Sequence, residues 1–182
     1  VFTNQKGDKI YYAHPTDENQ TCLFTQSKLM DHWGDEKQLP MNVNSATNDN
    51  YPFVLSDGVT LYYASEGNGS LGGYDLFVTR YNTSSDSYLA PEQLGMPFNS
   101  PFNDYMIVID ETKQLGWFVS DRHQPEGKVC VYLFIPDANH TRVESDDIEL
   151  KRRLAAINAI QESWKAGADY SAQIELAHQA MP

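Results

Sequence analysis

The chain has 182 residues, of which 41% are hydrophobic and 21% are charged. This length and composition are typical of one globular domain, or of one domain with a small appendage. The 25 acidic residues outnumber the 13 lysines and arginines, which gives a formal net charge of -12. Because phosphate backbones and anionic lipids both need a basic surface, this balance argues against nucleic-acid binding and against docking on anionic membranes. We expect no direct membrane insertion, since no segment approaches the ~20 apolar residues of a membrane span.

Three runs rich in β-branched and aromatic residues open the chain. They are VFTN at 1–4, KIYYA at 9–13 and CLFTQSKL at 22–29. Short runs of this composition predict strands rather than helices. Gly7-Asp8 separates the first two runs and is typical of a hairpin turn. With a weaker fourth strand expected near EKQL, at 36–39, residues 1–47 are predicted to form one antiparallel unit.

The same order of strands is predicted twice more, in residues 48–102 and 103–136. The second unit holds YPFVLS at 51–56, TLYYAS at 60–65, YDLFVTRYN at 74–82 and the weak PEQL at 91–94. The third holds YMIVID at 105–110, GWFVS at 116–120 and KVCVYLFIP at 128–136, with no convincing fourth strand. Asp57-Gly58 and Glu111-Thr112 mark the corresponding hairpin turns.

A duplicated motif links the units. QLPMNVNSATND at 38–49 and QLGMPFNSPFND at 93–104 share seven of twelve residues at a constant offset of 55. Unrelated segments match at roughly one position in twelve, so the motif indicates duplication. Four antiparallel strands that repeat every ~40–50 residues are typical of β-propeller blades. The sequence therefore predicts a mainly β fold in residues 1–142, a partial β-propeller of about three four-stranded antiparallel blades.

The repeat also resembles a known type. The segment YPFVLSDGVTLYYASEGNGSLGGYDLFVTRYN at 51–82 looks like the TolB-type, WD40-like propeller repeat, and PFNSPFNDY…GWFVSDR at 97–122 is similar to repeats in cell-envelope proteins of the Bacteroidetes. The resemblance covers about residues 1–136. It implies an extracytoplasmic protein, periplasmic or associated with the outer membrane, for example as a lipoprotein. The partners that it implies are an envelope protein or a glycan.

Three blades are fewer than the four to eight of known closed propellers, and a three-blade arc exposes strand edges. We expect further blades outside this segment, because Val1 begins in the middle of a strand pattern. Alternatively, another chain supplies the missing neighbour by self-association through the open blade edges, or the C-terminal tail covers them.

A helical hairpin is expected to follow, in residues 143–182, as an appendage or linker. Ser145 is predicted to cap the first helix, and apolar residues from Leu150 to Trp164 recur on one stripe at helical spacing. Gly167 is a suitable stop. A second short helix is expected at about 170–180, with Ile174 facing inward.

Asn48, Asp49, Asn103 and Asp104 occupy equivalent positions just before the first strands of units two and three. In one interpretation they form a ring of polar side chains at the propeller opening and bind a ligand or an ion. In the other they form Asx-turns, in which the side chain binds local backbone N–H groups. Duplication of the whole motif favours the structural interpretation, because a catalytic residue is seldom needed twice.

The glycine-rich loop EGNGSLGGYD at 66–75 supplies further oxygen ligands, Glu66, Asn68 and Asp75. These side chains are candidates for contact with a ligand or with calcium, although the spacing is not that of an EF-hand. The alternative is a flexible loop whose glycines permit positive φ. Apart from this possible calcium ion, no cofactor is expected.

Asp121, Arg122 and His123 follow the second strand of the third unit. A carboxylate, a guanidinium and an imidazole together can bind an anionic group or move a proton. The alternative is an exposed loop with an Asp–Arg contact. Cys22 and Cys130 fall at corresponding strand positions of units one and three, so we expect two free, buried thiols, kept apart by the intervening blade beyond the ~7 Å that a disulfide tolerates.

These features favour a non-enzymatic binding or scaffold module of the bacterial cell envelope. Its contact surface is expected in the loops at 14–21, 66–74 and 121–128, because they follow the same strand in each unit and emerge on one rim. One alternative is a glycan-processing enzyme, which needs two carboxylates ~5–10 Å apart; Asp49 and Asp104, with Glu66 or Asp121, are the candidates. The other is the propeller part of a serine peptidase, whose hydrolase domain is not within this sequence.

Overall fold

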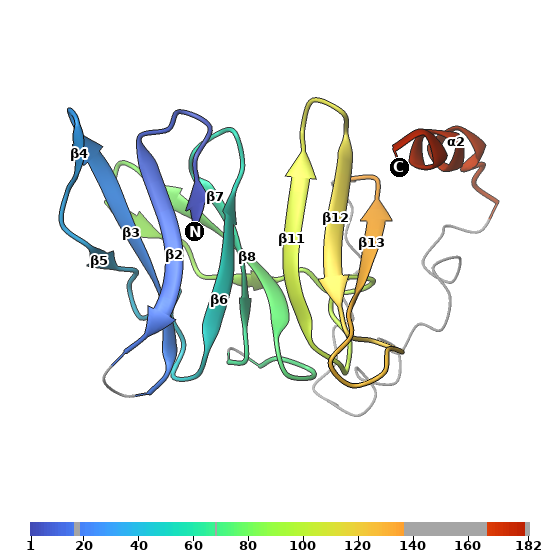
Figure 1. Cartoon of the computed structure of the whole chain (residues 1–182), viewed down its shortest axis with the longest axis horizontal. Coiled ribbons are helices and arrows are strands. Elements are labelled where there is room, and N and C mark those ends of the chain that lie inside the picture. Colours follow the sequence, from blue (N-terminus) through green and yellow to red (C-terminus); the bar gives the residue numbers. More distant parts are fainter. Residues whose placement is uncertain (17–18, 68, 137–166, 181–182) are drawn as a thin grey trace.

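A computed structural model describes residues 1–16, 19–67, 69–136 and 167–180 of the chain. In this part the protein is mainly β, and its strands form three antiparallel sheets that follow one another along the sequence. Figure 1 shows the sheets side by side, the first in blue, the second in teal and green, and the third in yellow and orange. The prediction of a mainly β fold is therefore confirmed.

The first sheet has the strand order β1-β2-β3-β4, with β5 also paired to β3, and the second has the order β10-β8-β7-β6, with β9 also paired to β8. The third sheet has the order β11-β12-β13. The strands of the first sheet are β1 (Phe2–Thr3), β2 (Lys9–Pro15), β3 (Thr21–Leu29), β4 (His32–Trp33) and β5 (Lys37–Gln38). Those of the second are β6 (Asp49–Val54), β7 (Thr60–Ser65), β8 (Asp75–Asn82), β9 (Ser87–Tyr88) and β10 (Glu92–Gln93). Those of the third are β11 (Asp104–Asp110), β12 (Leu115–Ser120) and β13 (Cys130–Phe134).

The weak fourth strands predicted at 36–39 and 91–94 correspond to the two-residue strands β5 and β10. Among the described residues, the third sheet has three strands. The hairpin turns also lie where they were predicted. Gly7 and Gly58 have φ values of 68° and 71°, the left-handed conformation for which glycine is the preferred residue, and in the third turn Gln114 takes φ 54°.

The pairing register shows which residues of the three sheets are equivalent. In each sheet one residue of the second strand pairs with a residue of the third strand. These pairs are Ala13 with Leu23, Ala64 with Leu76 and Val119 with Val131. Leu23, Leu76 and Val131 are therefore the same position of the repeat. One residue earlier, Cys22, Asp75 and Cys130 are equivalent, and one before that, Thr21, Tyr74 and Val129 are equivalent.

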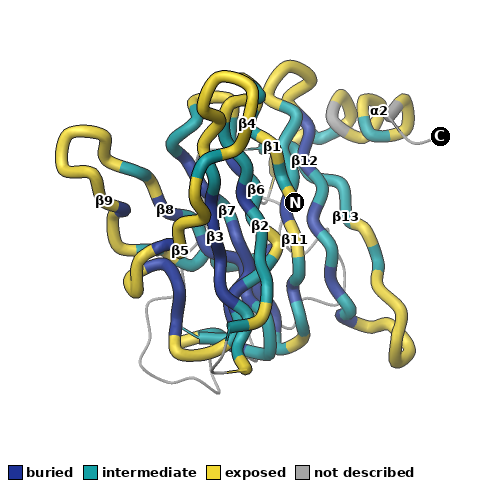
Figure 2. Tube along the Cα trace, turned by 60° about the vertical axis from the view of Figure 1, so that its left-hand side comes forward, coloured by how far each residue is buried: buried dark blue, intermediate teal, exposed yellow. Residues whose placement is uncertain are grey.

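Consecutive sheets pack through the first strand of the later sheet. β6 contacts β1, β2 and β3 of the first sheet, and β11 contacts β6, β7 and β8 of the second. Leu39 and Val43, from the duplicated motif, join the first buried cluster, while Leu94 and Phe98 from its second copy join the other. Figure 2 shows this burial concentrated in the inner strands and decreasing along β13. The duplicated motif therefore supplies apolar contacts at both sheet junctions.

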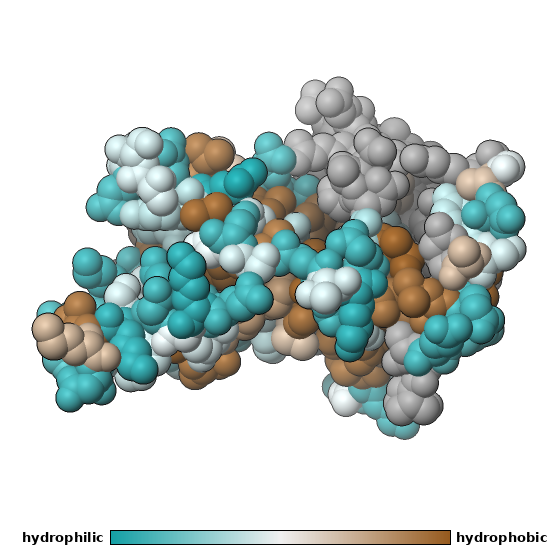
Figure 3. All heavy atoms as spheres, turned by 90° about the horizontal axis from the view of Figure 1, so that it is seen from above, coloured by the Kyte–Doolittle hydropathy of each residue, from teal (hydrophilic) through white to brown (hydrophobic). Residues whose placement is uncertain are grey.

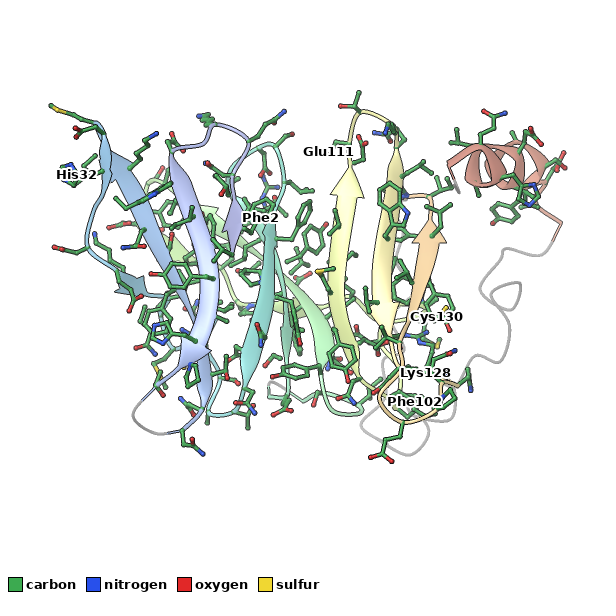
Figure 4. The ribbon with its side chains drawn as sticks, in the orientation of Figure 1. Phe2, His32, Phe102, Glu111, Lys128 and Cys130 are labelled. Atoms are coloured by element: carbon green, nitrogen blue, oxygen red, sulfur yellow. The ribbon has the colours of Figure 1, made fainter. Side chains whose placement is uncertain are left out.

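The two rims of the sheets differ in character. At the upper rim Glu111, labelled in Figure 4, accepts a hydrogen bond from the backbone N–H of Ser56 at 2.7 Å and so joins the hairpin turns of the second and third sheets. Figure 3, seen from above, shows hydrophilic segments projecting at this rim with apolar residues between them. The lower rim carries the longer loops that follow β2, β7 and β12.

Of the predicted C-terminal hairpin, the structure describes one short helix, α2 (Ser171–Ala180). It matches the second predicted helix, but Ile174, which was expected to face inward, is 39% exposed. The first predicted helix lies outside the described residues. None of the described helices is long and apolar enough to cross a membrane.

Both cysteines are free. Cys22 is 0% exposed, as predicted for a buried thiol. The same prediction is wrong for Cys130, which is only partly buried. The difference arises because Cys22 lies in β3, which is covered by β6, whereas no described strand covers β13.

Candidate functional site

A buried asparagine begins the polar part of the duplicated motif. Asn44 accepts a hydrogen bond from the backbone N–H of Leu23 at 2.7 Å and donates to the carbonyls of Leu23 at 3.1 Å and Leu39 at 2.8 Å. Asn99 accepts from the N–H of Leu76 at 2.9 Å and donates to its carbonyl at 3.0 Å. Both asparagines are 0% exposed. Each one therefore fastens the segment that leads into a sheet to the third strand of the sheet before it.

The serine after each asparagine binds the aspartate that starts the next sheet. The N–H and the hydroxyl of Ser45 donate to Asp49 Oδ2 at 2.6 and 3.0 Å. The corresponding distances from Ser100 to Asp104 are 2.7 and 2.9 Å. Both carboxylates are 0% exposed. Each aspartate therefore binds a local backbone N–H, as the structural interpretation expects, although this N–H lies four residues before the aspartate and not two residues after it as in an Asx-turn. Both carboxylates, the candidates for a glycan-processing pair, face the interior.

Asn48 and Asn103 each connect three segments. Each accepts a hydrogen bond from a backbone N–H at the start of the preceding sheet's third strand and donates to a carboxylate that follows its own sheet's second strand. The four distances are 2.9 Å from Thr21 N–H to Asn48, 2.8 Å from Asn48 to Glu66, 3.1 Å from Tyr74 N–H to Asn103 and 2.8 Å from Asn103 to Asp121. The structure therefore pairs Asn48 with Glu66 and Asn103 with Asp121. Both asparagines accept from N–H groups of another strand, so the predicted local Asx-turn is wrong for these two residues.

Arg122 is 6% exposed, so the expectation of an exposed loop with an Asp121–Arg122 contact is wrong. Its guanidinium donates to Asp104 Oδ1 at 2.5 Å and to the carbonyls of Pro97 at 2.6 Å and Phe98 at 2.5 Å. The arginine therefore compensates a buried carboxylate of the repeated motif, and its charge is held inside the fold.

Asp121 and His123 point elsewhere. Asp121 accepts hydrogen bonds from the N–H of Asn103 at 2.8 Å and from the hydroxyl of Tyr105 at 3.0 Å. His123 is exposed at φ 56°, and its ring centroid lies 5.5 Å from that of Phe102. The side chains of residues 121–123 are thus directed to three different places.

Asp75 is a buried carboxyl at the position that cysteines occupy in the other two sheets. It is 0% exposed, and its Oδ2 accepts the N–H of Leu71 at 2.8 Å. Its Oδ1 has no hydrogen-bond partner among the described residues. Burial, reinforced by the nearby carboxylate of Asp104, raises the pKa of Asp75 to about 7. This carboxyl therefore changes its charge inside the fold near neutral pH.

We predict that Asp75 makes the protein more stable at pH 5 than at pH 8. The pKa rises from 3.8 to about 7 in the folded protein, so folding takes up a proton between these values. The free energy of unfolding should therefore fall by about 2.5 kcal/mol between pH 5 and pH 8. Urea denaturation at both pH values measures this change.

The variant Asp75→Cys, which copies the equivalent Cys22, should flatten this pH dependence and stabilise the protein at pH 8. Asp35→Asn, at an exposed position of the first sheet, is the control and should leave the dependence unchanged. If the slope persists in the cysteine variant, another group is responsible.

The oxygens proposed for calcium in the glycine-rich loop do not gather at one point. Glu66 accepts from Asn48, the hydroxyl of Ser70 donates to the carbonyl of Glu66 at 3.0 Å, and Asp75 faces the interior. Asn68 lies outside the described residues. Within the ranges that the structure describes, no three histidine, cysteine, aspartate or glutamate side chains form a group able to hold a metal ion.

An open pocket of about 490 Å³ lies at the lower rim of the third sheet. Gly73 of the loop after β7 and residues of the loop after β12 line it together, so two of the three loops predicted to share a rim, 66–74 and 121–128, meet there. Figure 4 shows Phe102 and Lys128 at this end of the sheet, opposite Glu111. The lining residues are Gly73, Pro101, Phe102, Asn103, Tyr105, Asp121, Gln124, Pro125, Glu126 and Gly127.

Three tyrosines pack together beside this pocket, and we call them the tyrosine trio. The ring centroids of Tyr51, Tyr74 and Tyr105 are each 5.9 Å from the other two. Tyr51 is 38% exposed and has φ 53°, a costly conformation for an aromatic residue, at the place where the pairing of β6 with β7 shifts. The trio therefore presents aromatic surface and hydroxyl groups next to the carboxylate of Asp121.

Reasoning from the sequence missed Asn44, Asn99 and the tyrosine trio. The two asparagines are identical at the offset of 55, so their signal was present in the repeat. The tyrosines carry no such signal, because they occupy non-equivalent positions of their units and meet only in the folded chain.

No protein-family model matches this chain, and no curated protein matches it. The repeated motif and the rim pocket are therefore the observations from which a function is inferred.

Proposed function

We propose that the three sheets are blades of a TolB-type β-propeller, and that the chain is a non-enzymatic binding module of the bacterial cell envelope. The observation that carries the binding role is the rim pocket beside the tyrosine trio. The partner is an envelope protein that places a segment in this pocket, in the periplasm or at the outer membrane.

Two features support the assignment of the sheets as blades. Each sheet is an antiparallel meander, and the first strand of the later sheet packs on the earlier one. Radial repetition of such sheets is how propellers protect their edges. In that arrangement β6 and β11, which contact each other, are innermost strands, and the tyrosine trio lies near the mouth of the ring.

The chemistry of the pocket favours a polypeptide partner. Pro101, Pro125 and the 40% exposed Phe102 supply apolar contact area, and Asp121 and Glu126 supply carboxylates. Protein interfaces concentrate binding energy in aromatic anchors of this kind. The acidic groups, together with the net charge of -12, favour a basic segment in the partner. A glycan stacked on the tyrosine trio is the alternative ligand.

Photo-crosslinking tests this proposal. A benzoylphenylalanine in place of Phe102 should trap one protein from an extract of bacterial envelopes. The same residue in place of Lys113, in the turn between β11 and β12 at the other end of the sheet, should trap none. Proteolysis of the extract should abolish the adduct, and enzymatic removal of glycans should preserve it. Equal labelling at both positions, or an adduct that is lost on deglycosylation alone, would contradict a protein partner at this rim.

A matched pair of charge reversals tests whether the acidic groups of the pocket attract a basic segment of the partner. Glu126→Lys at the pocket should weaken formation of the adduct about tenfold, because like charges then meet in the complex. Asp35→Lys makes the same change of net charge at an exposed position of the first sheet and should have no effect. Equal effects of the two variants would show that only the overall charge matters.

A further inference from the structure

In the first two sheets the outer edge of the third strand, β3 or β8, is bound by the duplicated motif. Among the described residues, no such motif binds the corresponding edge of β13 in the third sheet. Leu23 in β3 and Leu76 in β8 are bound through their backbone by Asn44 and Asn99 of the duplicated motif. The N–H groups of Leu39 and Leu94, five residues before these asparagines, donate to the same two carbonyls at 2.9 and 3.0 Å. The equivalent residue of β13 is Val131.

Val131 is much more exposed to solvent than its counterparts in the first two sheets. Leu23 and Leu76 are 0% exposed, whereas Val131 is 59% exposed. In the described part of the chain β13 pairs with β12 on one side only. By the register of the repeat, the N–H and carbonyl of Val131 face away from β12, as those of Leu23 and Leu76 face away from β2 and β7.

A second contact point shows the same contrast. Thr21 and Tyr74 donate their N–H groups to Asn48 and Asn103, the second asparagine of each motif. Their counterpart is Val129, which is 52% exposed. Figure 4 labels Cys130, which lies between the two exposed valines at the start of β13. The edge therefore offers two attachment points with the spacing that the motif uses twice in this protein.

We propose that this edge of β13 binds a segment of another polypeptide that carries the motif Gln-Leu-x-Met-x-x-Asn-Ser-x-x-Asn-Asp. The first asparagine would bind the N–H and carbonyl of Val131, the leucine N–H would donate to that carbonyl, and the second asparagine would accept the N–H of Val129. The proposal rests on the assignment of the sheets as blades, since it treats β13 as the acceptor for a further repeat unit.

A second copy of this chain is a poor occupant. Both copies of the motif, at 38–49 and 93–104, are already bound to β3 and β8 of their own chain through buried asparagines. Releasing either copy would expose the apolar residues that it buries, such as Val43 at 0% and Phe98 at 5% exposure. A separate repeat unit carries no such cost.

The experiment is an NMR titration of the whole chain with a synthetic peptide of the sequence QLGMPFNSPFND, which is that of residues 93–104. The amide signals of Val129 and Val131 should shift saturably, and those of Leu23 and Leu76 should not. A control peptide with alanine in place of both asparagines should bind at least about tenfold more weakly. The backbone groups of Val129 and Val131 would then be covered by the peptide without receiving hydrogen-bond partners.

A variant of the protein gives a second measurement. Val131→Pro removes the N–H that the asparagine would accept, at an edge strand that tolerates proline, and should abolish the shift of Val129 while the spectrum of the other sheets is kept. Shifts that are equal for both peptides, that appear at Leu76, or that do not appear at all would overturn the proposal. Because the crosslinking at Phe102 reports on the rim pocket, its outcome is independent of this titration.

Discussion

Replacement of Arg122 by alanine should reduce the free energy of unfolding by about 3–5 kcal/mol. The side chains of Arg122 and Asp104 are 7% and 0% exposed, and the guanidinium lies 2.5 Å from the carboxylate. The alanine variant leaves this carboxylate buried without a counter-charge and removes the donors to the carbonyls of Pro97 and Phe98. It also removes a cation–π contact, in which Cζ of the guanidinium lies 5.1 Å from the centroid of the Phe118 ring. Urea denaturation followed by tryptophan fluorescence measures the loss.

Arg80→Ala is the matched control. Arg80 lies 3.8 Å from Asp57, but its side chain is 63% exposed, so the ion pair is screened by water and contributes less than about 1 kcal/mol. The double variant Arg122→Met/Asp104→Leu should recover part of the stability, because it removes the unpaired charge together with its partner. If Arg122→Ala costs no more than Arg80→Ala, the buried ion pair is not a source of stability.

Replacement of Asn99 by alanine should also reduce the free energy of unfolding strongly, by about 3 kcal/mol. The variant leaves the N–H of Leu76 buried without an acceptor and opens a cavity in a fully buried site. Asn44→Ala should cost a similar amount at the junction of the first and second sheets, because it leaves the N–H of Leu23 unpaired in the same way. Asn82→Ala, at an exposed position, should change stability by less than about 0.5 kcal/mol.

Hydrogen exchange distinguishes this local role from general destabilisation. Exchange at Leu76 should accelerate in the Asn99 variant beyond the acceleration at Leu23, and the Asn44 variant should show the reverse order. Uniform acceleration in both variants would mean that the asparagines stabilise the whole fold without fastening particular sheets.

The chain sequence alone predicted most of the strands. β2, β7 and β12 lie in the KIYYA, TLYYAS and GWFVS runs, and the first two hairpin turns lie at the predicted Gly7 and Gly58. These features depend on neighbours in sequence: alternation of side chains along a strand, and the few residues that tolerate a left-handed turn. The repeat at an offset of 55 likewise marked the duplicated motif before its contacts were known.

The tertiary structure alone decided which polar group meets which partner. Arg122 was expected beside Asp121, its neighbour in sequence, but it binds Asp104, which lies 18 residues away. Glu66 and Asp75, both assigned to one loop, separate into a rim residue held by Asn48 and a buried carboxyl. Cys22 and Cys130 occupy the same repeat position and differ in burial, because in the part of the chain that the structure describes a sheet packs over Cys22 and none packs over Cys130. The period of a strand specifies which side chains share a face, whereas burial, charge compensation and pKa depend on which other segment covers that face.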